Sequence, residues 1–265
     1  MKLFISSDME GVTGVTAWED VRKGTSSYEY FREQMTNEIS AICESAKKLG
    51  YTDILVKDAH STARNILIDK LPSGVKLFSG WAKDPFTMMS GLDNSFDAVF
   101  FTGYHAGAFF DGNPLAHTMS SERIFYFKIN DEYVSEFLLN SYIAAYFGVP
   151  IVGIAGDERI CNYAKKVVPN ITPMPVKKGI GSGVISLTSN DALNMISNKT
   201  TEALNNDLSL CLLDLPEYFN CELCFRDLSL AHKASFYKGA VKKDAQTVLF
   251  ETADFYEVLR FFFFV

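Results

Sequence analysis

The stretch LFISSDMEG, residues 3–11, is the most informative part of the sequence for predicting the fold. Its short apolar run, Leu3 to Ile5, is expected to form a strand, and two acids, Asp8 and Glu10, follow directly. Because side chains two apart on an extended backbone point to the same face, these two carboxylates share one side of the chain. The stretch therefore predicts a strand that delivers two carboxylates to the edge of a sheet.

Two later segments repeat this arrangement. The apolar run Ile54 to Val56 precedes Asp58 and His60, and Val99 to Phe101 precedes His105. Ligands of open parallel sheets bind outside the carboxyl ends of the strands. We therefore expect Asp8, Glu10, His60 and His105 to meet at one edge of the sheet.

The spacing of apolar residues predicts alternating strands and helices. Apolar residues at three- and four-residue steps indicate helices over 27–49 and 134–147. The run 98–102 is wholly apolar, as in a strand buried on both faces of a sheet. The other predicted strands of this part cover residues 2–6, 53–57, 75–78 and 151–155. Such alternation is typical of an α/β fold with a mostly parallel, doubly wound sheet.

The remaining segments predict a smaller C-terminal α+β portion. Residues 121–134 resemble a β-hairpin or arm, and 177–183, with three glycines in five positions, is the expected linker. A helix over 189–204, capped by Ser189 or Asn190, is followed by predicted strands over 219–225, 234–242 and 246–250. We therefore expect a metal-binding catalytic domain over 1–180 and a smaller α+β domain over 184–265.

Bulk composition excludes several classes of partner. The chain has 265 residues, a net charge of −7 and a pI near 5.2, without a long Lys/Arg run. Nucleic acid and anionic membrane surfaces are therefore not the expected partners. The five cysteines are odd in number in a chain that is not short, which favours reduced thiols and a cytoplasmic location. No apolar stretch at the amino terminus is long enough for a signal peptide, and the terminal Phe261 to Val265 is too short to cross a bilayer.

A mixture of carboxylates and imidazoles is a ligand set for zinc, manganese or cobalt. Each residue taken singly has a simpler interpretation. Asp58 and Asp157 suit a turn or helix cap, and a single histidine is more often a hydrogen-bonded polar group than a ligand. Cys221 and Cys224 lack a second pair, so we expect buried structural cysteines, and His232 is expected to be structural.

Six motifs resemble those of the DppA-type D-aminopeptidases and occur in the same order. They are SDMEG (7–11), KDAHS (57–61), GYHA (103–106), AHTM (116–119), SEFLLN (135–140) and AGD (155–157). The resemblance implies two zinc ions per chain, bridged by Asp8 and held also by Glu10, His60, His105 and Glu136. It implies that His117 is catalytic. One departure is Ser135, where the family is expected to have glycine.

The resemblance further implies an aminopeptidase that hydrolyses short peptides with an N-terminal D-amino acid. Cobalt or manganese are possible substitutes for zinc. A ring-like homo-oligomer is expected, decameric in the family, with the arm 125–133 and the Phe-rich terminus as contacts. Two alternatives stay open: a metal-dependent amidase acting on another small amide or peptidoglycan fragment, and a metal-stabilised assembly protein without turnover.

Overall fold

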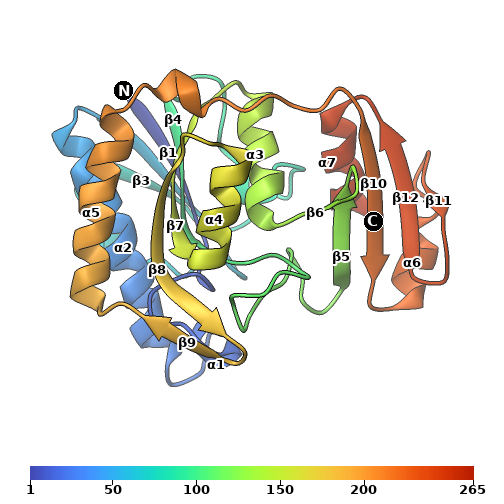
Figure 1. The fold of residues 1–265 in the computed structure, drawn as a ribbon, viewed down its shortest axis with the longest axis horizontal. Coiled ribbons are helices and arrows are strands. Elements are labelled where there is room, and N and C mark those ends of the chain that lie inside the picture. Colours follow the sequence, from blue (N-terminus) through green and yellow to red (C-terminus); the bar gives the residue numbers. More distant parts are fainter.

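The computed structural model describes residues 1–265 and contains two β-sheets flanked by helices (Figure 1). Seven strands form the larger sheet, in the order β3-β2-β1-β4-β7-β8-β9. Their bounds are β1 Lys2–Ser7, β2 Asp53–Asp58, β3 Val75–Phe78, β4 Ala98–Tyr104, β7 Ile151–Asp157, β8 Thr172–Ile180 and β9 Gly183–Ser186. All neighbours are parallel except β8 and β9. The predicted α/β fold with a mostly parallel sheet is confirmed.

Helices cover both faces of this sheet, as a doubly wound fold requires. α2 (Tyr28–Lys48) and α5 (Ser189–Asn205) pack together on one face, and α3 (Glu136–Tyr146) and α4 (Glu158–Val167) lie on the other. The apolar positions that predicted α2 form its buried stripe, including Met35, Ile39, Ile42 and Ala46. None of the helices combines the length and apolar character needed to cross a membrane.

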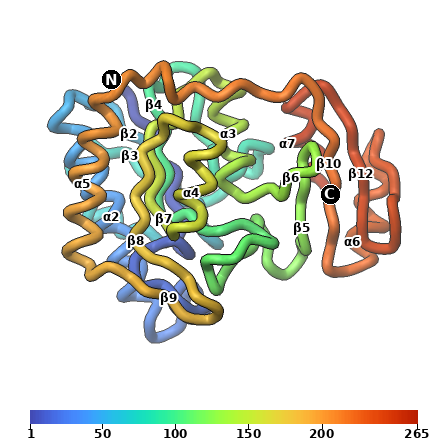
Figure 2. The backbone as a smooth tube through the Cα atoms, in the orientation of Figure 1, coloured from blue at the N-terminus to red at the C-terminus, as the bar shows by residue number.

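The smaller sheet is antiparallel and has the order β11-β12-β10-β5-β6. Its strands are β5 Ile124–Ile129, β6 Glu132–Tyr133, β10 Phe219–Phe225, β11 Val241–Lys242 and β12 Thr247–Thr252. α6 (Leu228–Ala234) and α7 (Phe255–Phe264) pack against it, and residues 206–218 cross the molecule from α5 to β10 (Figure 2). The predicted division at 180–184 stays a prediction. Segments from both sides of this division are mixed in the two sheets. β5 and β6 precede it but belong to the smaller sheet, and β9 and α5 pack with the larger sheet.

Three local predictions were wrong. Residues 177–183 are not a linker, because they form the β8–β9 hairpin with Gly181 at positive φ in its turn. Residues 234–242 do not form a strand beyond Val241–Lys242. Asp227 caps a helix that runs to Ala234, and Gly239 at positive φ interrupts the chain before β11. The cap of α5 is Thr188, one residue earlier than expected.

In the strand order, β2 and β3 lie on one side of β1, whereas β4 and the later strands lie on the other side. Ligands of open α/β sheets bind at such a change of side, which here is the crevice between the ends of β1 and β4. The backbones are in direct contact there. A Cβ on Gly11 would overlap the carbonyl oxygen of Tyr104, and one on Gly103 would overlap that of Asp8. Glycine at these positions lets the loop after β1 lie against the end of β4, which brings Asp8 close to His105.

Candidate metal centre

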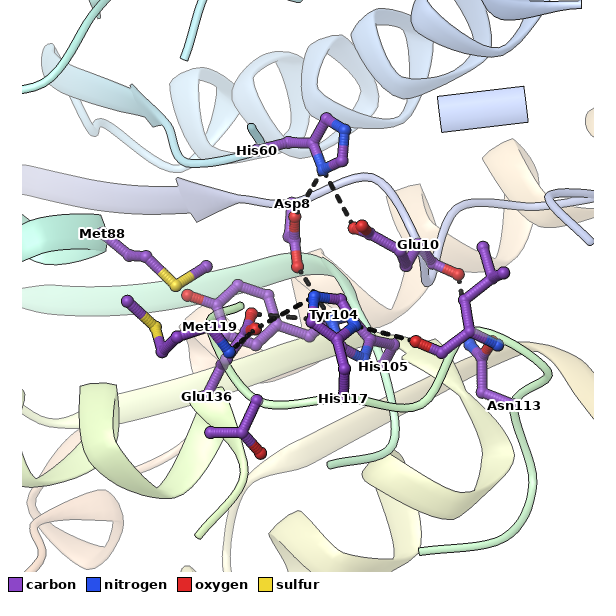
Figure 3. Close-up of polar contacts among 12 residues, drawn as sticks. Asp8, Glu10, His60, Met88, Tyr104, His105, Asn113, His117, Met119 and Glu136 are labelled. Atoms are coloured by element: carbon purple, nitrogen blue, oxygen red, sulfur yellow. Dashed lines mark hydrogen bonds and ion pairs between the residues drawn. The ribbon is translucent and has the colours of Figure 1, made fainter. Parts of the chain in front are cut away.

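All six residues predicted for the site lie in one cluster beyond the carboxyl edge of the larger sheet, and all but His117 are buried (Figure 3). Asp8 and Glu10 follow β1, His60 follows β2, and His105 follows β4. The other two come from outside the sheet: His117 lies in the loop between β4 and β5, and Glu136 begins α3. The fold therefore brings the six predicted residues together.

The first donor group consists of Asp8, Glu10 and His60, whose ligand atoms lie within 4.8 Å of one another. The His60 Nδ1 is 3.0 Å from Glu10 Oε2 and 3.3 Å from Asp8 Oδ1. Both carboxylates are almost fully buried. Two carboxylates and one imidazole therefore converge on a point that solvent barely reaches.

The second donor group consists of His105, His117 and Glu136. The His105 Nε2 is 3.6 Å from Glu136 Oε2 and 3.3 Å from Asp8 Oδ2, so Asp8 faces both groups with one oxygen each. The two imidazole rings are stacked, with centroids 4.5 Å apart. Glu136 is fixed by the backbone N–H of Met119, which donates to its Oε1 over 2.6 Å. Its place in the first turn of α3 favours a negative charge.

Each of the three histidines has one ring nitrogen held by a backbone carbonyl. The His60 Nε2, His105 Nδ1 and His117 Nδ1 lie 2.8 Å from the oxygens of Val21, Ala106 and Leu115 respectively. A carbonyl only accepts, so these nitrogens carry hydrogen, and the opposite nitrogens of the neutral rings are free to bind a ligand. The His105 Nε2 is buried and has no hydrogen-bond partner. Metal-binding histidines have this same arrangement, with the second nitrogen donating to a carbonyl or carboxylate.

The charges of the cluster are strongly coupled. Burial raises the pKa of Asp8 to about 6, and the carboxylates of Glu10 and Glu136 act in the same direction. Burial also disfavours ionised Glu10 and Glu136, but the neighbouring imidazoles hold the pKa of Glu10 well below its usual range and lower that of Glu136 to about 2. Burial likewise opposes protonation of His60 and His105, yet the facing carboxylates raise both of their pKa values well above 6.5.

These directions predict that zinc binding releases protons. The facing carboxylates favour the protonated forms of His60 and His105 in the metal-free cluster, so a metal ion must displace a proton from each ring that it binds. Zinc affinity is therefore expected to rise with pH through the neutral range. Calorimetric titration with zinc in buffers of different ionisation enthalpy measures the number released. A heat independent of the buffer would contradict the prediction.

The cluster opens into a cavity of about 310 Å³. Both tryptophans of the chain line it, and Trp18 packs edge-on against the ring of His117 at 5.4 Å between centroids. Arg22, Met88 and Glu122 are among the other lining residues. The volume is at the small end of the range for ligand sites in proteins. It suits a small molecule or the end of a peptide and excludes a folded protein domain.

The other candidates have structural places. Asp58 accepts hydrogen bonds from the backbone of Asn65 and Ile66, as a turn residue does, and Asp157 caps α4 as expected. The five cysteines are unpaired and buried, so Cys221 and Cys224 are buried as predicted. His232 is exposed on α6, beside Phe236 and away from the cluster.

Two buried polar residues that contact the site were not predicted from the sequence. Lys177 donates to the backbone oxygen of Glu10 over 2.6 Å, and Asn113 donates to the same oxygen over 3.1 Å. These partners lie 167 and 103 residues away from Glu10 in the chain, so no local pattern marks them. Burial lowers the pKa of Lys177 to about 8, opposed by the carboxylates around it.

Comparisons with known proteins agree over the whole chain. The model of the peptidase M55 family, described as D-aminopeptidase, matches residues 1–264. The D-aminopeptidase of Bacillus subtilis (strain 168) is 36% identical over 265 residues, covering 98% of this chain and 94% of that protein. A solved structure, described as the zinc-dependent D-aminopeptidase DppA from Bacillus subtilis, a self-compartmentalizing protease, superposes with a TM-score of 0.92. It is 34% identical, and the match covers 99% of this chain and 95% of the other.

Proposed function

This chain belongs to the peptidase M55 family of D-aminopeptidases, and on that premise we propose that it is a zinc-dependent aminopeptidase. Its substrates are short peptides with an N-terminal D-amino acid. The relatives named above support this assignment, since one is a D-aminopeptidase and the other is described as zinc-dependent.

The observation that carries the proposal is the position of Asp8 between two donor groups. Its Oδ1 faces His60 and its Oδ2 faces His105. We assign one ion to Asp8, Glu10 and His60, and a second to Asp8, His105 and Glu136, with Asp8 shared. Two zinc ions in these places would polarise a scissile carbonyl and lower the pKa of a water molecule.

His117 is assigned the proton transfers rather than a place among the ligands. Its Nδ1–H is held by Leu115, so its Nε2 faces Glu136 Oε1 at 3.7 Å and borders the cavity. Trp18 and the stacked His105 ring fix its plane. In this orientation Nε2 accepts a proton from an attacking water and returns it to the leaving amine.

The proposed assembly is a homo-oligomer, a decamer by resemblance to the family. Exposed Phe109, in the loop after β4, stacks on the half-buried Tyr133 of the β5–β6 arm and meets the exposed Phe125 edge-on. Exposed aromatic groups of this kind mark contact surfaces. The structural relative is described as self-compartmentalizing, which supports closure of the site by other copies.

Zinc content and a panel of paired substrates test the proposed function together. The purified chain is expected to contain two zinc ions and to hydrolyse D-Ala-D-Ala and D-alanine p-nitroanilide faster than the L-isomers. Removing zinc with a chelator is expected to abolish this activity, and zinc, cobalt or manganese to restore it. Hydrolysis of other amides alone would favour the amidase alternative. Bound zinc without turnover of any amide would favour the assembly protein.

A further inference from the structure

Three buried polar side chains outside the proposed ligand set surround the backbone of the site. They are Asn113 in the loop after β4, Asp157 at the end of β7, and Lys177 on β8, and we call them the polar brace. Each is at least nine-tenths buried. Buried polar groups are retained where their hydrogen bonds are satisfied, and here the partners belong to the loops that carry the donor groups.

The brace holds the loop of the first donor group. The carbonyl oxygen of Glu10 accepts from Asn113 Nδ2 over 3.1 Å and from Lys177 Nζ over 2.6 Å (Figure 3 shows Asn113 beside Glu10). Lys177 also donates to the oxygen of Val15 over 2.6 Å. The main chain on both sides of Gly11 is thereby tied to β8.

The same brace holds the loop of His105. The carboxylate of Asp157 accepts from the backbone N–H of Ala106 over 2.7 Å and from Asn113 Nδ2 over 2.9 Å. The oxygen of that same Ala106 accepts from His105 Nδ1, so the peptide groups flanking Ala106 link Asp157 to the ring. Asn113 therefore connects Glu10 in one donor group to Asp157, which supports the other.

His117 is attached to the brace in the same manner. Asn113 Oδ1 accepts from the N–H of Leu115 over 2.8 Å, and the oxygen of Leu115 accepts from His117 Nδ1 over 2.8 Å. One side chain, Asn113, thus has contacts that lead to both donor groups and to the proposed catalytic histidine.

We propose that Asn113, Asp157 and Lys177 are positioning residues that set the separation of the two donor groups around Asp8. This inference rests on the metal assignment of the proposed function. Zinc sites tolerate little error in ligand position, and residues that orient ligands without touching the ion typically contribute 10- to 100-fold in metal affinity. Because the polar brace contacts the loops of both donor groups, its loss is expected to lower the affinity of the chain for both zinc ions.

The test is zinc affinity, measured by competition with a chromogenic chelator. The variants are Asn113→Ala, which leaves Lys177 on the Glu10 oxygen, and Lys177→Met, which keeps the aliphatic stem. Each is expected to weaken zinc binding by about 10- to 100-fold with the fold retained by circular dichroism. Lys178→Met is the matched control, since the neighbouring Lys178 is exposed and pairs with Glu158. Its zinc affinity is expected to be unchanged.

A second readout separates positioning from general stability. In the cobalt-loaded protein, the visible absorption bands report ligand geometry and are expected to shift in the brace variants but not in Lys178→Met. If the folded brace variants bind zinc as tightly as the unsubstituted chain, with unchanged cobalt bands, the brace proposal is overturned while the proposed function stands. Absence of zinc binding by the unsubstituted chain would instead overturn the proposed function itself.

Discussion

Replacing His117 with alanine is expected to lower kcat by about 10²- to 10⁴-fold while the chain keeps both zinc ions. The ring borders the cavity, and its Nε2 lies 3.7 Å from Glu136 Oε1. Removing it takes away the proton acceptor but leaves Asp8, Glu10, His60, His105 and Glu136 in place. Steady-state kinetics on D-Ala-D-Ala, together with zinc content, measure both parts of this expectation.

The matched control for this variant is His232→Ala. His232 is exposed on α6 and contacts Phe236 rather than the cluster, so activity and zinc content are expected to be unchanged. The donor atoms of His117, His105 and Glu136 all lie within 4.8 Å of one another, so geometry also permits His117 to be a ligand. Loss of one zinc ion from His117→Ala would establish that role and refute a purely catalytic assignment.

Replacing Asp8 with asparagine is expected to remove both zinc ions and to lower kcat/KM by at least about 10³-fold. The charge that both ions share is lost, and with the ions the site loses several kcal/mol of transition-state stabilisation. Asparagine keeps the shape of the side chain but lacks the charge that faces His60 and His105. The metal-free variant is expected to fold. The raised pKa of Asp8, caused first by burial and then by the neighbouring carboxylates, means that its charge is unfavourable in the metal-free cluster above about pH 6, so its removal relieves that cost there.

The variants Glu10→Gln and Glu136→Gln are the comparison for Asp8→Asn, because they test whether the loss of both ions is particular to Asp8. Each of these residues belongs to one donor group, so each variant is expected to lose one ion and retain the other. Thermal unfolding with and without zinc then reports the number of ions that stabilise the fold. An Asp8→Asn chain that still shows the full zinc-dependent rise in Tm would contradict a shared Asp8.

Local sequence was enough to predict four of the candidate ligands and five strands of the larger sheet, β1, β2, β3, β4 and β7. The apolar run of β4 and the apolar stripe of α2 can each be read from a short stretch of sequence, because the spacing of apolar residues shows which face of the element is buried. Asp8, Glu10, His60 and His105 follow from the same reasoning, because parallel strands that end at one edge bring their next residues together. Glu136 and His117 lie outside the strand ends, and only the family resemblance selected them.

Tertiary structure alone decided the rest, since it depends on residues that are far apart in the chain. The pairing of β5 with β10 is settled by contacts between segments far apart in the chain. The pairing of β8 with β7 likewise places the expected linker in the larger sheet. Lys177 became part of the site because β8 lies near the loop after β1, 167 residues away. Hydrophobic periodicity reports which face of an element is buried, but the partner of a buried polar group is fixed only when the chain closes on itself.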